Sequence, residues 1–177
     1  MDDESSSADQ LRTAILNEQT HLLDAAMVKF RHCVYQLSHD QLWWRPASDL
    51  NSIANLMLHV CGNMTQWIIC GVGGSEDTRD RQAEFDAVDD RTRDELWSML
   101  EQCVNDVRNV IHAAKPENLL TIRDVQGFDV TGLGAIVHSV THFVGHTHQV
   151  IQLTRLQLGE NYVFEWSPDG GHKTLPI

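Results

Sequence analysis

Four long stretches of the chain place apolar residues at every third or fourth position. They run from about 8 to 37, 52 to 70, 92 to 114 and 131 to 159. This period is typical of amphipathic α-helices. Pro46 and Pro116 interrupt the pattern, while Thr131 and Gly159 are suited to begin and end the last helix. The pattern therefore predicts four long helices.

The segments between and around these helices differ in composition. Residues 71–91 are rich in glycine and then strongly charged, which predicts a long crossover loop that is either mobile or functional. Residues 117–130 form either a short hairpin or a return loop, and the sequence does not decide between them. We expect a disordered leader at 1–7 and a tail at 160–177 that packs on the bundle. The predicted fold is all-α, a four-helix bundle over residues 8–159 with a long crossover.

Charge narrows the range of partners. The 177 residues include 25 acidic and 13 basic ones, for a formal net charge of −12. Binding to a polyanion requires a basic surface, so nucleic acid and anionic membranes are not expected as partners. The sequence shows neither a secretory signal peptide nor an 18-residue apolar span, which favours a cytoplasmic location. The cysteines have no C-x-x-C spacing and are interpreted as reduced core thiols: Cys33, Cys61, Cys70 and Cys103.

The faces of the fourth helix separate its histidines. One stripe, expected to face the neighbouring helices, consists of Leu133, Val137, Val140, Val144, Thr147, Ile151, Thr154 and Leu158. A second line is hydrophilic and contains His148, which we interpret as solvated. A third line, otherwise apolar or small, contains His142 and His146 at a spacing of four residues. Side chains at this spacing are neighbours, so both rings can bind one ion.

Two alternatives remain for this pair. His142 and His146 bind a metal, or they are core histidines that hydrogen-bond Gln149 or a backbone carbonyl. His138 has the same spacing from His142 but lies nearer the exposed side. We therefore rank His138 below His146 as a ligand.

A metal site needs at least a third protein ligand, and His59 is the candidate. It lies in an apolar run of the second helix, where the alternative is a buried core histidine. Three imidazoles without a carboxylate would leave a coordination position for water, as in a reactive site. The remaining histidines show no comparable arrangement and are interpreted as surface or helix-end residues: His21, His32, His39, His112 and His172.

Two stretches carry a family resemblance. NSIANLMLHVCGNMTQWI, residues 51–68, and HFVGHTHQVIQLTRLQLG, residues 142–159, are similar to the histidine motifs of the DinB-like (DinB/YfiT) superfamily of metal-binding four-helix bundles. The similarity extends coarsely from about residue 10 to 159. This resemblance implies an antiparallel bundle with a long crossover, and it implies that His59, His142 and His146 are the metal ligands. One departure is His148, where the superfamily usually has glycine, so the outward face of this helix differs or a partner helix packs less closely.

Activity follows only loosely from the resemblance. Superfamily members with known chemistry bind a low-molecular-weight thiol and use the metal to activate it. We expect a metal-dependent thiol S-transferase or hydrolase with a divalent transition metal, zinc or nickel, acting on a small-molecule substrate. Asn63 and Gln149 are the expected residues for orienting the ligands or the substrate. The alternatives are a non-catalytic metal-binding or stress-response bundle and a metal-free interaction module, and a homodimer is expected.

Overall fold

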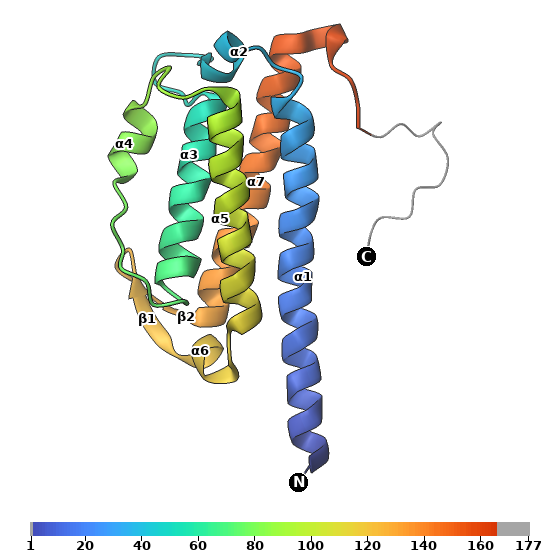
Figure 1. Cartoon of the computed structure of the whole chain (residues 1–177), viewed down its shortest axis with the longest axis vertical. Coiled ribbons are helices and arrows are strands. Elements are labelled where there is room, and N and C mark those ends of the chain that lie inside the picture. Colours follow the sequence, from blue (N-terminus) through green and yellow to red (C-terminus); the bar gives the residue numbers. More distant parts are fainter. Residues whose placement is uncertain (1, 166–177) are drawn as a thin grey trace.

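Four long helices form the molecule in the computed structural model, which describes residues 2–165 (Figure 1). They are α1 (Asp2–Val34), α3 (Ile53–Met64) with its continuation η1 (Thr65–Cys70), α5 (Arg93–Ala113) and α7 (Gly132–Leu158). α1 and α7 run in one direction, and α3 and α5 run in the other (Figure 1). α1 packs against α7 and α5, and α3 packs against the same two helices. The predicted four-helix bundle is confirmed, but only two of its packed pairs are antiparallel (α1 with α5, α3 with α7), and the other two are parallel (α1 with α7, α3 with α5).

Five short elements lie in the connections. They are the helices α2 (His39–Trp43), α4 (Arg81–Asp86) and α6 (Pro116–Leu120), and the antiparallel strands β1 (Ile122–Val125) and β2 (Phe128–Thr131). The sequence analysis predicted none of the short helices. The hairpin is one of the two alternatives left open for residues 117–130. α4 divides the long crossover and packs on the outer side of α3 (Figure 1).

Capping residues explain why three predicted helix starts lie within one residue of the observed ones. Ser52 and Asn55 form a reciprocal capping box at the start of α3, as Thr92 and Glu95 do at α5. Thr131 accepts a hydrogen bond from a backbone amide in the first turn of α7. Such side chains satisfy backbone amides that have no partner within the helix.

The first helix has different ends from those predicted. α1 begins at Asp2, before the expected start near residue 8, so the helix includes most of the segment expected as a leader. It ends at Val34 rather than 37, because the amides of Gln36 and Leu37 bond carbonyls three residues back. This tightens the last turn toward 3₁₀ geometry. The disorder expected at residues 1–7 stays a prediction.

The tail follows α7 toward the end of α1. The backbone amide of Val163 donates to Gln36 Oε1 at 2.7 Å, and the carbonyl of Val163 accepts from Gln36 Nε2 at 3.2 Å. These two bonds hold Val163 at the end of α1, while the packing expected for the whole tail, 160–177, stays a prediction. The rest of the expected tail, including His172, lies outside the described residues.

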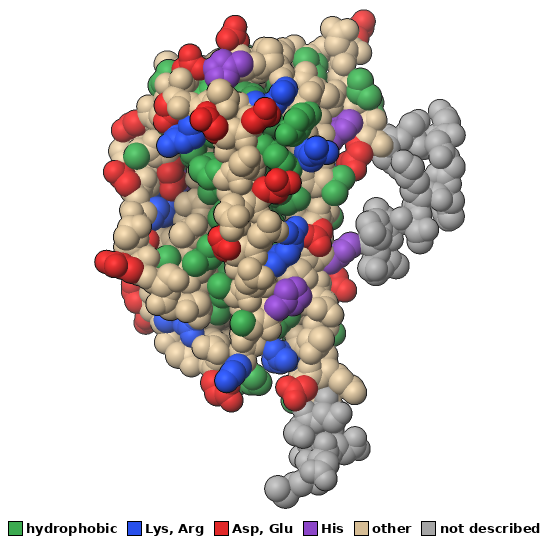
Figure 2. All heavy atoms as spheres, in the orientation of Figure 1, with side chains coloured by type: hydrophobic (Ala, Val, Ile, Leu, Met, Phe, Trp, Pro, Cys, Tyr) green, Lys and Arg blue, Asp and Glu red, His purple; other side chains and the backbone are tan. Residues whose placement is uncertain are grey.

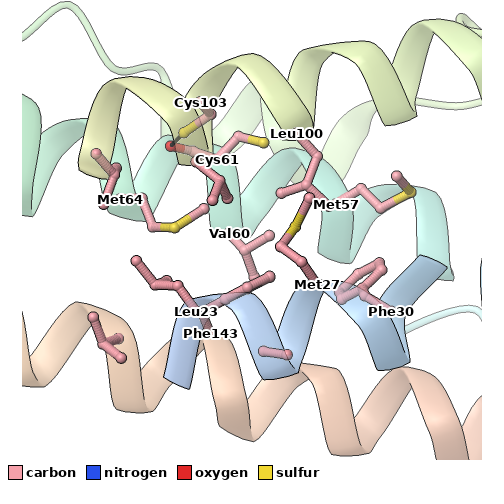
Figure 3. Close-up of a cluster of buried hydrophobic side chains, with 14 of the residues drawn as sticks. Leu23, Met27, Phe30, Met57, Val60, Cys61, Met64, Leu100, Cys103 and Phe143 are labelled. Carbon is pink, nitrogen blue, oxygen red and sulfur yellow. Dashed lines mark hydrogen bonds between the residues drawn. The ribbon is translucent and has the colours of Figure 1, made fainter. Parts of the chain in front are cut away.

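Side chains from all four long helices meet in one core (Figure 3). Leu23 of α1, Met57 of α3 and Leu100 of α5 are fully buried. Phe30 of α1 stacks on Phe143 of α7, with ring centroids 5.8 Å apart. Because this core is large and continuous, the bundle has enough buried apolar surface to fold without a structural metal.

The cysteines are free thiols, as the sequence analysis predicted. Cys33, Cys61 and Cys103 are buried in the core, whereas Cys70 is only half-buried, so the prediction of a core position is wrong for Cys70. The Cys103 thiol donates to the Cys61 backbone oxygen at 3.6 Å, which links α5 to α3 (Figure 3).

The surface agrees with the negative net charge. Figure 2 shows acidic side chains spread over one face of the molecule, with basic side chains interspersed among them. Among residues 2–165, no helix is long and apolar enough to cross a membrane.

The buried face of α7 is rotated relative to the predicted one. Three members of the predicted stripe are buried, namely Val140, Thr147 and Thr154. Val137 of that stripe is 38% exposed, and three residues from outside it are fully buried: Ile136, Phe143 and Val150. The buried positions 136, 140, 143, 147, 150 and 154 have the same three-and-four spacing as the predicted stripe, so periodicity alone does not separate the two. Contact with α1 on one side and α3 on the other fixes the rotation.

This rotation predicts unequal effects of two truncations on α7. Phe143→Ala should lower the free energy of unfolding by about 3–5 kcal/mol, because it removes a fully buried ring and leaves a cavity. Val137→Ala should cost less than about 1 kcal/mol, because its side chain is partly solvated. Urea denaturation followed by circular dichroism measures both values. Equal losses would contradict the observed orientation of α7.

Candidate metal centre

α3 and α7 bring three imidazoles together. His59 Nε2 lies 3.0 Å from His142 Nε2, and His146 Nε2 lies 3.1 Å from His142 Nε2. The three nitrogens all lie within 4.8 Å of one another. His59 is buried, and the other two rings are half-buried. The three histidines selected from the sequence therefore form one cluster.

Local sequence explains this meeting point. The four-residue spacing on α7 puts two rings on one side of the helix. Opposite them, the Ser52 cap fixes the start of α3 and so the position of His59 along that helix. Between the helices, the Ser139 hydroxyl donates to Asn63 Oδ1 at 2.8 Å, and both residues are buried. This hydrogen bond links α3 to α7, and the role expected for Asn63 in orienting the ligands or the substrate stays a prediction.

Gln149 determines the tautomer of His146. Its Oε1 lies 2.9 Å from His146 Nδ1, and an amide oxygen only accepts hydrogen bonds. His146 therefore carries its proton on Nδ1. The Nε2 lone pair is left facing the other two rings.

Glu84 has the same effect on His59. Its Oε2 lies 3.0 Å from His59 Nδ1, so this nitrogen donates and the Nε2 lone pair faces the cluster. Arg79 Nη2 lies 3.2 Å from the same ring nitrogen and 2.9 Å from the same carboxylate oxygen. Two donors thus converge on one acceptor oxygen.

The sequence analysis did not select Glu84 or Arg79. Both come from the crossover, whose charged composition indicated a solvated loop. The signal that could have found them is the apolar pair Phe85 and Ala87 within that charged run. Phe85 contacts the His59 ring, and Ala87 packs against the core.

The resulting donor set fits a divalent ion. Two of the three Nε2 atoms present lone pairs to the third, and His142 Nε2 has at most one proton to share between them. The Nε2 lone pair of His59 or of His146 therefore has no hydrogen-bond donor within the cluster of three rings. Nitrogens bound to a tetrahedral ion at about 2.0–2.1 Å are separated by about 3.3 Å, close to the two shortest separations here.

Burial keeps the α7 imidazoles neutral. It lowers the pKa of His142 from 6.5 to about 4, with further lowering by positive charge on His146 and His59. Burial also lowers the pKa of His146, although the hydrogen bond to Gln149 opposes this. Neutral rings are the form that binds metals.

Glu84 stays ionised for a different reason. Burial raises the pKa of this carboxyl group, but hydrogen bonds from Arg79 and His59 outweigh burial and leave the pKa below its usual value. The site therefore contains a carboxylate together with the two neutral imidazoles of α7.

Aromatic rings pack around the three imidazoles. Phe85 lies 4.9 Å from the His59 ring. On the other side, His138 stacks on Trp67 at 4.0 Å and lies parallel to His142 at 5.9 Å. His138 is therefore a neighbour of the cluster rather than a member of it, in keeping with its lower rank. His148 lies on the exposed side of α7, as predicted.

Comparisons with solved structures show the same fold. A conserved protein from Enterococcus faecalis has a TM-score of 0.69 and 20% identity, with 81% of this chain and 96% of that chain covered. A DinB-like protein from Bacillus subtilis has a TM-score of 0.62 and 17% identity, with 88% of this chain and 99% of that chain covered. A mutant of the mycothiol-dependent maleylpyruvate isomerase has a TM-score of 0.62 and 12% identity, with 76% of this chain and 60% of that chain covered.

These similarities confirm, at the level of the fold, the resemblance to the DinB-like superfamily. No curated protein sequence matches the chain. The model of one sequence family, described as proteins of unknown function (DUF1572), matches residues 10–167. This match covers most of the chain, and the protein therefore belongs to the DUF1572 family.

Proposed function

We propose that this protein is a metal-dependent enzyme whose His59, His142 and His146 hold a divalent transition ion, zinc or nickel, for reaction of a small-molecule thiol. One observation carries the proposal. Three Nε2 atoms from two helices converge, and acceptors fix the proton of two of the rings on the far nitrogen. A core histidine cluster without a metal would instead pair each lone pair with a donor.

The residues of the chain have separate tasks in this proposal. Bound there, a divalent ion supplies Lewis acidity, which lowers the pKa of a thiol or a water molecule toward neutrality. His142 and His146 are half-buried, so a small molecule can approach from the α7 side. Gln149 and Glu84 orient two of the rings and exclude the tautomers that would turn a proton toward the ion.

A thiol is the preferred nucleophile for one reason. One of the structural relatives is named as a mycothiol-dependent isomerase. We infer from this relative that the chain uses a low-molecular-weight thiol, and transfer of that thiol to an electrophile is the reaction we propose. Hydrolysis, with water in place of the thiol, is the related reaction to be tested beside it.

An activity screen tests the reaction class. Zinc- or nickel-loaded protein should conjugate a low-molecular-weight thiol to an electrophile such as 1-chloro-2,4-dinitrobenzene faster than free metal ion does. Ester and amide substrates, assayed in parallel, report hydrolysis. His142→Ala, loaded in the same way, is the matched control. Metal binding without activity in either assay would instead favour the non-catalytic metal-binding bundle.

Metal uptake should depend on the inner face of α7 and not on the outer face. Untagged wild-type protein should bind about one ion per chain, and His142→Ala should reduce this to near zero because too few ligands remain. His148→Ala, on the exposed face, should retain the full content. Elemental analysis by mass spectrometry measures all three. Equal losses in the two variants would overturn the assignment of ligands to this face.

The metal-free protein should lose stability in mild acid. Because the pKa of His142 is about 4 in the folded state and 6.5 normally, the unfolded chain binds more protons between these values. The free energy of unfolding should therefore decrease as the pH falls through this window. Above the window, His142 is neutral in both states and should not destabilise the fold. The free energy of unfolding of His142→Gln should decrease less over the same window, because this variant lacks the titrating imidazole.

Urea denaturation with EDTA, at about pH 7.5 and about pH 5, measures this difference. Wild type and His142→Gln should differ in how much stability each loses between the two pH values. An identical loss in both would show that His142 is not held neutral by its surroundings.

A further inference from the structure

We propose that Glu84 is a positioning residue for His59, held in place by Arg79 and accommodated by Gly62. Its task is to keep the proton of His59 on Nδ1 and so direct the Nε2 lone pair into the cluster. This inference rests on the proposed function, because it concerns the way a ligand is presented to an ion. It assigns a role to the crossover, which contributes no imidazole to the cluster.

The first argument is the isolation of this contact from solvent. His59 is 7% exposed and Glu84 is 9% exposed, and their hydrogen bond of 3.0 Å joins α3 to α4. A hydrogen bond to an ionised group in such surroundings is stronger than one between neutral groups. It therefore holds one tautomer of the ring and one ring orientation.

The second argument is the arginine clamp. Arg79 Nε donates to Glu84 Oε1 at 2.7 Å, and Arg79 Nη2 donates to Glu84 Oε2 at 2.9 Å. The Arg79 side chain is only 4% exposed, and its Nη1 donates to Gln66 Oε1 at 2.9 Å. Two parallel bonds fix the plane of the carboxylate, so its second oxygen meets His59 in one geometry.

The third argument is the glycine beneath the carboxylate. Gly62 follows His59 by three residues and lies on the same side of α3. A Cβ at this position would lie 1.9 Å from Glu84 Oε1 and 2.8 Å from Arg79 Nε. Any other residue at 62 would force the carboxylate to move. Glycine therefore provides the space in which the clamp forms.

The backbone of the crossover is held independently of this carboxylate. Asn55 Nδ2 donates to the carbonyls of Glu84 and Ala87, at 3.0 and 2.9 Å. Arg45 Nη2 donates to the carbonyl of Phe85 at 2.7 Å. α4 therefore has contacts with α3 that do not involve the Glu84 side chain (Figure 1). A change confined to that side chain should leave the segment in place, which makes its role testable.

The chemical consequence follows from the charge of the acceptor. A carboxylate that accepts the Nδ1 proton makes the opposite ring nitrogen a stronger electron donor. Loss of such a partner typically weakens metal affinity by about 10–100-fold. Arg79 moderates the effect because it shares the carboxylate charge.

The most direct test reads the His59 tautomer in the metal-free wild-type protein. Nuclear magnetic resonance of ¹⁵N-histidine-labelled protein should show the proton of His59 on Nδ1. In Glu84→Gln, this preference should decrease, and in Gly62→Ala, which keeps the carboxylate but displaces it, the preference should decrease as well. A purely structural role for Glu84 would not change the tautomer. A proton on Nε2 in the wild type would overturn the proposal.

Cobalt(II) affinity provides the second measurement. Glu84→Gln should weaken binding by about 10–100-fold and alter the visible absorption of the bound ion. Glu101→Gln, which changes an exposed carboxylate on α5, should stay within about twofold of wild type. A folded Glu84→Gln protein with wild-type affinity and spectrum would contradict the proposal. If the wild type binds no cobalt, the proposed function fails, while the tautomer measurement still tests the contact between Glu84 and His59.

Discussion

The packing of α3 against α7 is the contact on which the rest of the site depends. It brings His59 within 3.0 Å of His142, with two lone pairs turned toward the same point. Lone pairs facing one another are unfavourable unless a proton or a cation lies between them. The bundle maintains this arrangement because the large core of four helices, rather than contacts among the imidazoles, fixes α3 and α7.

The functional tasks are divided between the bundle and its longest connection. The helices present the nitrogens, and the crossover supplies the carboxylate that orients one of them, together with the arginine that holds this carboxylate. In the proposed metal centre, the ligands would lie on the rigid helices, and the residues that orient one of them would lie in the crossover. Changes in the crossover can therefore tune the cluster without disturbing the core.

The sequence predicted the bundle well because helical period and capping side chains are local properties. Thr92 and Thr131 define the starts of α5 and α7 through contacts within three residues. The three-histidine cluster was also accessible, because four-residue spacing on α7 places two rings side by side. The rotation of α7, with Phe143 inward, depends on two neighbouring helices and was missed. Glu84 was missed because its contact with His59 spans 25 positions and is made by a loop of charged residues.

The central claim is that three imidazoles from two helices bind one divalent ion. X-ray absorption spectroscopy at the metal edge of protein purified without a histidine tag tests it most directly. The account predicts a shell with three imidazole nitrogens at about 2.0–2.1 Å. A shell with fewer than three imidazoles would contradict it.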